Sequence, residues 1–258
     1  MFARERKEAL VSYIRRYRKA SIHELAREFQ VTEATIRTDL KELEKENLVI
    51  RTHGGAMLHH GAVEKEDFLS MRRGQCQDEK SLIANEATKY VEEGDIILID
   101  SGTTMLKFAQ QLVDFHNLKV VTNDFNIALE LQRSPSIEVV FVGGTVRNRF
   151  ECTFGSLGIE FLKKILVDKI FLSPNAVSVN QGLTTPNEET AAMKRTMLSI
   201  ANEAYMLCDS SKIGRKTFYQ FAQLNEFKRM IVDDGISNQV VKEIEETGLK
   251  IDICKKKQ

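Results

Sequence analysis

The chain has 258 residues, of which 42% are hydrophobic and 29% are charged, and its 37 lysines and arginines balance 37 aspartates and glutamates. This composition indicates a globular protein with one large or two modest domains. No apolar run reaches the length of a membrane span, and the charged residues near Met1 do not resemble a signal segment. We therefore expect a cytoplasmic protein.

The four cysteines, Cys76, Cys152, Cys208 and Cys254, are far apart and form no Cys-x-x-Cys pair. This spacing indicates neither a zinc site nor a disulfide framework. We expect four reduced thiols, no bound metal and no cofactor.

The balanced net charge hides a difference between the two ends of the chain. Residues 1–56 hold 12 lysines and arginines against 9 acidic residues, and the remainder holds 25 against 28. The amino-terminal part is therefore mildly basic, by three charges. So small an excess predicts weak binding to a nucleic acid unless more than one copy takes part.

The first helices of the chain are predicted from apolar periodicity and capping residues. Leu10, Tyr13, Ile14 and Tyr17 form the expected buried face of an initial helix. The sequence Ser21-Ile22-His23-Glu24 has the form of a capping box and predicts a second helix from Ser21 to about Phe29. Only two residues then remain before Thr32, so a tight turn should lead into the next helix, as in helix-turn-helix proteins.

The third predicted helix, residues 32–43, has one apolar face and one polar face. Ile36, Leu40 and Leu43 repeat at the spacing of a buried stripe, and Thr32 is placed to cap the helix start. The opposite face is cationic and rich in hydroxyl groups, which suits the major groove of DNA. Its residues are Ala34, Thr35, Arg37, Thr38 and Lys41. A single amphipathic helix is more often a solvated bundle helix, so the DNA-binding interpretation depends on its neighbours.

Downstream of this helix, residues 48–52 have the pattern of a strand and lead into His53-Gly54-Gly55-Ala56. This is a hairpin signal and would form the wing of a winged helix-turn-helix domain. We expect Arg51 and His53 of this hairpin to join Thr32 and the polar helix face in binding DNA.

These motifs together resemble the amino-terminal signature of the DeoR family of bacterial sugar-metabolism regulators. The resemblance is carried by Glu24-Leu25-Ala26, Val31-Thr32, Thr35-Ile36-Arg37, Asp39-Leu40, Leu43 and residues 51–56. Two positions depart from the family pattern: Thr32 replaces the usual serine, and Thr38 replaces a usual second arginine. The resemblance implies a DNA-binding regulator with a winged helix-turn-helix domain over residues 1–57.

After a predicted linker, residues 58–77, the pattern changes to apolar strands that mostly alternate with helix-length segments. This spacing predicts an α/β domain over residues 78–258, with a mostly parallel, doubly wound sheet. Six strands are predicted, at residues 96–99, 118–121, 139–142, 169–172, 204–207 and 230–232. In such a sheet, ligands bind beyond the carboxyl ends of the strands.

Small and polar residues gather at these predicted strand ends. Asp100-Ser101-Gly102-Thr103-Thr104 follows the first strand, and helix N-termini after such loops bind anions. One such loop is more often a simple turn with a helix cap, but five polar strand ends on one edge favour a ligand site. The other candidate residues are Thr122, Asn123, Gly143, Gly144, Asn175, Glu189 and Lys212.

The same residues apart from Asn175, with Gly182-Leu183-Thr184, Lys194 and Asp209-x-Ser211-Lys212, resemble the effector-sensing domain of the DeoR family. That domain is similar in fold to ribose-5-phosphate isomerase, which supplies an alternative: a sugar-phosphate isomerase or deaminase with an attached DNA-binding head. Glu189 and Lys212 could serve such an enzyme. The acid-rich segment of the isomerases, however, corresponds here to Ser173-Pro174-Asn175-Ala176-Val177, which has no ionisable side chain.

The favoured interpretation is therefore a regulator and not an enzyme. We expect a transcriptional repressor of a carbohydrate-utilisation operon that binds double-stranded operator DNA. The resemblance implies that a phosphorylated sugar or sugar alcohol, bound in the carboxyl-terminal domain, controls it. We also expect a homo-oligomer, a dimer or a tetramer, with no membrane partner.

Overall fold

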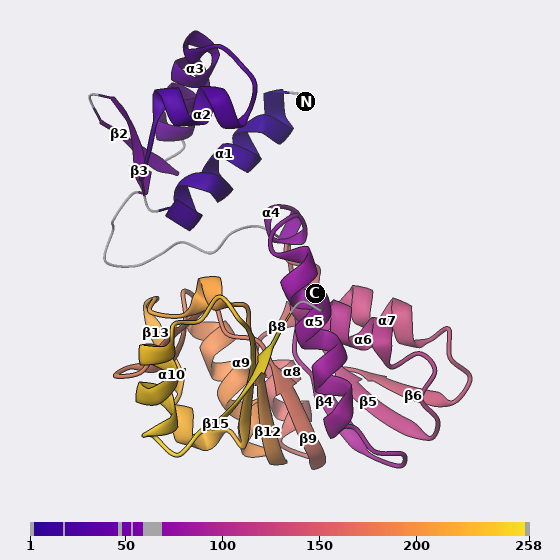
Figure 1. Cartoon of the computed structure of the whole chain (residues 1–258). Helices are drawn as coiled ribbons and strands as arrows, with labels where there is room; N and C mark the ends of the chain where they lie inside the picture. The colour runs from indigo at the N-terminus through magenta and orange to yellow at the C-terminus, as the bar shows by residue number, and fades with distance from the viewer. Residues whose placement is uncertain (1–2, 18, 46–47, 53, 59–68, 256–258) are drawn as a thin grey trace. The chain divides into compact units, whose positions relative to one another are not determined.

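A computed structural model describes residues 3–17, 19–45, 48–52, 54–58 and 69–255 (Figure 1). The chain divides into two compact units, residues 1–62 and residues 63–258. No helix in the described ranges combines the length and the apolar composition needed to cross a membrane.

The amino-terminal unit contains three helices and a small antiparallel sheet of order β1-β3-β2. Its elements are α1 (Ala3–Tyr17), β1 (Lys19–Ser21), α2 (Ile22–Glu28), α3 (Glu33–Lys45), β2 (Val49–Thr52) and β3 (Gly55–Leu58). The helices enclose a core because each contributes one apolar stripe. The fully or almost fully buried side chains are Leu10, Val11, Ile14, Leu25, Ile36, Leu40, Leu43 and Val49.

The connection between α2 and α3 follows from the residues at its ends. Ser21 and Glu24 form the predicted capping box at the start of α2. Gln30 has a φ of 51°, and the Val31 amide donates to the Ala26 carbonyl at 3.1 Å, which closes the turn. Thr32 then accepts the Thr35 amide at 3.2 Å through its hydroxyl. The predicted helix-turn-helix with a hydroxyl cap is confirmed.

Two details of this unit differ from the prediction. Tyr17 is 53% exposed, and its ring packs on Tyr13 at a centroid distance of 4.5 Å, because α1 ends there and the chain continues into β1. The second is a buried acid, Asp39, which is 3% exposed in the core-facing part of α3. Arg6 of α1 neutralises it with an Nε–Oδ2 distance of 2.6 Å, and so connects the first and third helices.

The second unit is built on a parallel sheet of seven strands, in the order β15-β14-β12-β9-β4-β5-β6. The strands are β4 (Ile96–Ile99), β5 (Leu118–Thr122), β6 (Ile137–Phe141), β9 (Val167–Leu172), β12 (Ala201–Leu207), β14 (Arg229–Asp233) and β15 (Lys250–Cys254). The chain first builds outward from β4 to β6 and then returns to add β9 on the other side of β4. The pair β4 and β9 is therefore the point where the direction of building reverses.

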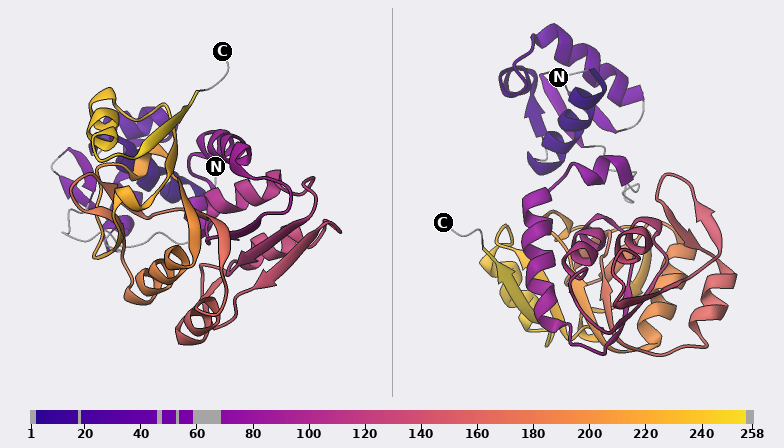
Figure 2. Two further views of the ribbon diagram at one scale, coloured as in Figure 1. Left: turned by 90° about the horizontal axis from the view of Figure 1, so that it is seen from below. Right: turned by 90° about the vertical axis from the view of Figure 1, so that its right-hand side faces the viewer.

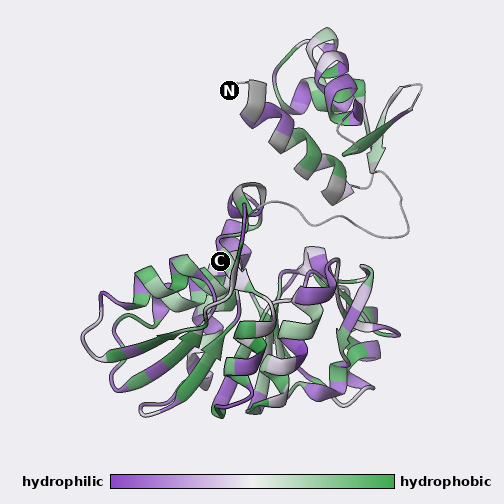
Figure 3. Ribbon diagram, turned by 180° about the vertical axis from the view of Figure 1, so that it is seen from behind, coloured by the Kyte–Doolittle hydropathy of each residue, from purple (hydrophilic) through white to green (hydrophobic). Residues whose placement is uncertain are grey.

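Helices cover both faces of this sheet (Figures 1 and 2). The helices α5 (Gln77–Ala87), α6 (Thr103–Gln111) and α7 (Phe125–Leu131) pack on one face, and α8 (Ser156–Leu162), α9 (Glu188–Ser199) and α10 (Asn238–Glu245) pack on the other. Successive strand residues point to opposite faces, so Ile97 and Ile99 join one core and Leu98 joins the other. Figure 3 shows hydrophobic residues concentrated along the central strands.

Shorter elements complete the second unit. A hairpin of β7 (Thr145–Arg147) and β8 (Cys152–Phe154) follows β6, and a three-stranded antiparallel sheet contains β10 (Ala176–Ser178), β11 (Gly182–Thr185) and β13 (Tyr219–Ala222). There are also the helix α4 (Leu69–Arg73) and the 3-10 turns η1 (Thr88–Tyr90), η2 (Ser210–Lys212) and η3 (Leu224–Glu226).

The predicted parallel sheet is confirmed, and all six predicted strands are present with shifts of a few residues at their ends. The edge strand β15 was not predicted, because its alternation of Ile251 and Ile253 with polar residues does not resemble a doubly buried strand. The last part of the predicted linker, where the sequence favours a short helix around Phe68, forms α4 and the first residue of α5. Leu69 of α4 is only 4% exposed.

Replacing Phe171 of β9 by alanine should destabilise the second unit by about 3–5 kcal/mol. The side chain is fully buried, and its ring lies 4.4 Å from Phe108 and 5.1 Å from Tyr205 between centroids, so a large cavity would remain. Urea unfolding of this unit measures the change. Phe218→Ala is the matched control, because Phe218 is 63% exposed, and it should change stability by less than about 0.5 kcal/mol. Equal losses in the two variants would contradict the proposed packing.

Candidate functional site

The polar face of α3 is exposed, as its sequence predicts. Ala34, Arg37, Thr38 and Lys41 are exposed and Thr35 is half-buried, while Ile36, Leu40 and Leu43 lie in the core. The helix thus presents a continuous hydroxyl-bearing and cationic surface to solvent.

One ion pair and two hydrogen bonds connect neighbouring side chains and backbone groups along this surface of α3. The Arg37 guanidinium pairs with Glu33 one turn earlier, with an Nη2–Oε2 distance of 2.7 Å. Because both groups are well exposed, this pair contributes less than about 1 kcal/mol and can open when Arg37 meets another partner. Thr32 and Thr35 share a hydrogen bond between their hydroxyls at 2.9 Å, and the Thr38 hydroxyl donates to the Ala34 carbonyl at 3.1 Å.

The hairpin of β2 and β3 is joined to the carboxyl-terminal part of α3. The Arg51 amide donates to the Glu44 carboxylate at 3.0 Å, and the Arg51 guanidinium lies 3.7 Å from the same carboxylate. Arg51 is exposed, on the strand that leads into the turn. His53, the other predicted hairpin residue, lies outside the described residues.

The second candidate site lies at the carboxyl edge of the parallel sheet, where β4 and β9 are neighbours. Ligands in open α/β sheets bind where the strand order reverses, and this pair of strands is that place. A pocket is present here. It is lined by Leu69, Arg72, Ser101, Gly102, Arg147, Phe150, Cys152, Ser173, Asn175, Thr190 and Lys194.

The pocket brings together three of the predicted effector residues, Ser101, Gly102 and Asn175. Gly102 is the N-cap of α6 and has a φ of 136°, a conformation that L-residues rarely adopt. A glycine cap carries no side chain, so the first amides of α6 receive no side-chain cap. Such a helix start attracts an anion.

Asp100 lies at the end of β4 and is buried rather than open to a ligand, with 2% of its surface exposed. Its carboxylate forms an ion pair with Lys194 of α9 and accepts the Ser173 amide at 3.3 Å. Lys194 also donates to the Ser173 carbonyl at 2.9 Å. Asp100 therefore joins the ends of β4 and β9 to α9. It also holds Lys194, which lines the pocket.

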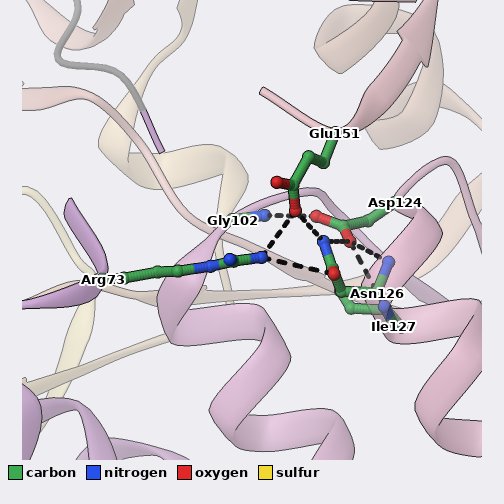
Figure 4. A network of polar contacts seen from close by, with 6 residues as sticks. All are labelled: Arg73, Gly102, Asp124, Asn126, Ile127 and Glu151. Atoms are coloured by element: carbon green, nitrogen blue, oxygen red, sulfur yellow. Dashed lines mark hydrogen bonds and ion pairs between the residues drawn. The ribbon is translucent and has the colours of Figure 1, made fainter. Parts of the chain in front are cut away.

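A second buried acid, Asp124, accepts a hydrogen bond from the backbone at the start of α6 (Figure 4). Its carboxylate caps α7 by accepting the Asn126 and Ile127 amides at 2.8 and 3.2 Å, and it accepts the Gly102 amide at 3.1 Å. Burial raises the pKa of Asp124 to about 6, although these hydrogen bonds act in the opposite direction. The network continues from Asn126 to Glu151 at 2.7 Å and from Glu151 to Arg73.

The remaining predicted residues surround the pocket without lining it. Thr103 and Thr104 are buried at the start of α6, and Thr122 is buried at the end of β5. The Asn123 side-chain nitrogen, Nδ2, donates to the Thr153 carbonyl at 2.7 Å. The buried side-chain oxygen, Oδ1, has no hydrogen-bond partner among the described residues.

Three further predicted residues lie on the β6–β7 loop and on α9. Gly143 and Gly144 connect β6 to β7, and a Cβ atom on Gly144 would lie 2.5 Å from the Phe154 carbonyl oxygen. This close approach of β8 requires a glycine. Glu189 is exposed in the first turn of α9.

Lys212 belongs to a cluster of charged groups beside the pocket, with Lys80, Asp209 and Arg72. Burial lowers the pKa of Lys212, and the nearby Asp209 opposes this effect. Burial also lowers the pKa of Lys80 to about 8, and Asp209 again opposes this effect. Burial acts to raise the pKa of Asp209. The charge of Lys212 and the hydrogen bond from Ser211 nevertheless hold this pKa below its usual value. Arg72 is the member of this cluster that also lines the pocket.

Several pocket residues were not among the predicted contacts. Ser173 directly follows a predicted strand and Lys194 belongs to the family resemblance, but the other residues come from segments without a clear pattern. Leu69 and Arg72 fall in the predicted linker, where the basic pair Arg72-Arg73 is a weak signal. Phe150 and Cys152 belong to the β7–β8 hairpin, and Thr190 lies in the first turn of α9.

Two family models match the two units. Residues 6–61 match a DeoR-like helix-turn-helix domain, and residues 75–234 match the DeoR C-terminal sensor domain. The chain belongs to the DeoR family. The resemblance noted in the sequence is thereby confirmed for both ends of the chain.

Relatives in this family align over nearly the whole chain. The chain is 34% identical over 251 residues to the HTH-type transcriptional regulator GlpR of Haloferax volcanii, covering 97% of this chain and 98% of that protein. It is 32% identical over 239 residues to the HTH-type transcriptional repressor GlcR of Bacillus subtilis, covering 93% and 91%. It is 30% identical to the lactose phosphotransferase system repressor of Staphylococcus epidermidis, covering 90% and 92%.

Among solved structures, the expected likeness to ribose-5-phosphate isomerase is found. The enzyme of Methanocaldococcus jannaschii is 20% identical in sequence, and the match covers 53% of this chain and 54% of that one with a TM-score of 0.40. This likeness is too low to support an argument about function.

Asp124→Asn should change the dependence of stability on pH. Because the pKa of Asp124 in the folded protein is about 6 rather than 3.8, the folded state binds a proton more tightly than the unfolded state. The stabilising contribution of this proton is complete below about pH 4 and is lost as the pH rises through about 6, an effect of roughly 1–3 kcal/mol. Urea unfolding of the second unit between about pH 4 and 7.5 should show a smaller loss in the variant. Asp114→Asn, at an exposed position, should keep the wild-type slope; an unchanged slope in Asp124→Asn would refute this role.

Proposed function

We propose that the protein is a transcriptional repressor of a carbohydrate-utilisation operon, controlled by a phosphorylated sugar or sugar alcohol. Operator DNA would bind to the polar face of α3 and the β2–β3 hairpin. The effector would bind in the pocket at the carboxyl ends of β4 and β9. The chain belongs to a family whose relatives include named repressors, one of them a lactose phosphotransferase system repressor, and this supports both parts of the proposal.

One observation carries the effector proposal: a pocket at the strand-order reversal that combines cations with an uncapped helix start. Arg72 and Arg147 line it together with Gly102, at the N-terminus of α6. Guanidinium groups and helix-terminal amides are the groups that bind phosphate in proteins. Lys194 is paired with Asp100, and the two arginines bring guanidinium groups to the same pocket.

The remaining polar lining suits the sugar part of such a molecule. Ser173, Asn175 and Thr190 present hydroxyl and amide groups, and Phe150 adds an apolar surface. Hydroxyl and amide groups can donate and accept hydrogen bonds, as a polyol requires. The Asn175 side chain is held in place because its oxygen accepts the Thr185 hydroxyl at 2.9 Å.

DNA binding by this protein should require at least a dimer. One amino-terminal unit has three excess positive charges and one reading helix, which predicts weak binding on its own. Two such units that face repeated half-sites would multiply the affinity without a new kind of contact. The proposal therefore includes a homo-oligomer, a dimer or a tetramer.

Arg37→Ala should reduce binding to the operator by roughly 1–3 kcal/mol and reduce discrimination against random DNA. Arg37 is exposed on the polar face of α3, and its guanidinium can make two hydrogen bonds to a guanine edge. Lys41→Ala on the same face is the matched comparison; it should weaken binding to all sequences alike and lower the salt dependence. The measurement is fluorescence anisotropy on operator and random DNA at several salt concentrations. Unchanged discrimination in Arg37→Ala would mean that another face of α3 reads the bases.

Ser101→Asp should abolish the response of operator binding to sugar phosphates. The new carboxylate would lie in the pocket beside Gly102 and repel a phosphate, and we expect a loss of binding of about ten-fold or more. A panel of sugar phosphates is first screened by thermal shift on the wild-type protein, and each hit is then added to the operator titration. Ser156→Asp is the control, since Ser156 is exposed at the start of α8, where an acid is well tolerated. A wild-type response in Ser101→Asp would exclude this pocket as the effector site.

A further inference from the structure

The helix α4 is the first described element of the second unit, and it follows the chain segment that leads from the DNA-binding unit. Two of its residues, Leu69 and Arg72, line the pocket. A third, Arg73, joins the network of Figure 4. The segment that connects the two units therefore ends inside the candidate effector site.

Contacts fasten α4 to the turn of the β7–β8 hairpin. The Leu69 amide donates to the Arg149 carbonyl at 3.2 Å, and the Arg73 guanidinium pairs with the Glu151 carboxylate at 2.5 Å. The same turn supplies Arg147 and Phe150 to the pocket, with the Arg147 guanidinium 3.8 Å from the centre of the Phe150 ring. Residues 69–73 and 147–151 together form one cover over the pocket, which we call the α4 cap.

The hairpin half of the α4 cap is in a conformation that its contacts must maintain. Arg149 has a φ of 68° and Glu151 has a φ of 57°, and L-residues other than asparagine and aspartate rarely adopt these values. The hydrogen bond from Leu69 is made to Arg149, and the ion pair of Arg73 is made to Glu151. A change in the position of α4 would thus act directly on the side of the pocket that carries Arg147.

At its carboxyl end, α4 is anchored by a buried lysine. Lys80 of α5 is 3% exposed, and its ammonium group donates to the Arg72 carbonyl at 2.7 Å and to the Gln75 carbonyl at 2.6 Å. This anchoring directs the Arg72 side chain across the start of α6. A Cβ atom built on Gly102 would lie 3.4 Å from the Arg72 Nη2 atom.

The charges of the pocket explain why an anion should favour a closed cap. Within the part of the chain that the structure describes, the charged residues that line the pocket are Arg72, Arg147 and Lys194, all of them cations. Lys194 pairs with Asp100, and Arg72 and Arg147 come from the two halves of the α4 cap. An anion bound between these two guanidinium groups would attract both halves and so favour the closed position.

We infer that Arg72 is a direct ligand of the anionic group of the effector, and that the α4 cap transmits effector binding to the segment leading to the helix-turn-helix unit. This inference rests on the proposed function. Binding of an anion between Arg72 and Gly102 holds α4 against the pocket. The coupling is reciprocal, so DNA that favours another position of α4 weakens effector binding by the same factor.

The test uses the full-length protein and four probes: inorganic phosphate, glycerol 3-phosphate, glucose 6-phosphate and fructose 1-phosphate. Calorimetric titration should give a dissociation constant that is raised about ten-fold or more in Arg72→Gln. Arg133→Gln is the control, since it removes the same charge from a well-exposed position outside the pocket lining and the α4 cap, and its affinity should stay within about three-fold. Arg72→Lys, which keeps the charge but loses the planar fork, should fall between the two.

Transmission is measured separately, with each variant saturated by the tightest-binding probe. In the wild-type protein the probe should slow hydrogen exchange of the amides of residues 69–73 and change the affinity for operator DNA. Both effects should be lost in Arg72→Gln even at saturation. Circular dichroism melting without probe establishes that each variant is folded.

The possible outcomes are distinguishable. If the wild-type protein binds none of the four probes, the proposed function fails and the inference fails with it. If the wild type binds but Arg72→Gln binds equally well, the effector site stands and Arg72 is not a ligand. If saturated Arg72→Gln keeps the wild-type operator response, transmission through α4 is refuted. If Arg72→Gln does not fold, Arg72→Lys carries the same comparison.

Discussion

The buried ion pair between Lys194 and Asp100 determines the shape of the effector side of this molecule. Removing two charges from water is costly, and the cost is recovered only when the remaining hydrogen-bonding groups are satisfied. Here the Ser173 amide and carbonyl satisfy both partners, at 3.3 Å to Asp100 and 2.9 Å to Lys194. The pair thereby joins β4, β9 and α9 at the place where the strand order reverses. Lys194 also lines the pocket beside these strand ends, so the pair fixes one of its walls.

The two units have separate cores, and under the inference above effector binding reaches the DNA-binding unit through the chain that joins them. The core of the helix-turn-helix unit is closed by its own residues, including the pair of Arg6 and Asp39. In the second unit, the first described element after the joining segment is α4. Its residues line the pocket and join the Asp124 network. A short covalent connection with one end in a ligand site is sufficient for coupling, and no large interface between the units is required.

Much of this arrangement could be predicted from the sequence, for a physical reason. Strands such as β4 and β9 are buried on both faces, so they form short apolar runs, and the polar residues after them mark the carboxyl edge of the sheet. The helix α3 was predictable because its apolar residues and its polar residues each repeat at helical spacing. Arg72 and Phe150 were not, because short elements that fold back over a pocket leave no period in the sequence. Glu189 illustrates the opposite limit: the family resemblance marks it, yet it is exposed on α9, and its role stays a prediction.

The two acids at the carboxyl edge show why this pocket suits binding better than catalysis. A general base must have a lone pair directed at the proton that it removes. Asp100 is occupied by Lys194 and the Ser173 amide, and Asp124 is occupied by the Gly102, Asn126 and Ile127 amides. Both carboxylates therefore fix backbone amides at the carboxyl edge of the sheet, Asp100 at the end of β9 and Asp124 at the starts of α6 and α7. What they leave is a fixed helix start next to Arg72, which under the proposed function would hold a phosphorylated sugar without moving its protons.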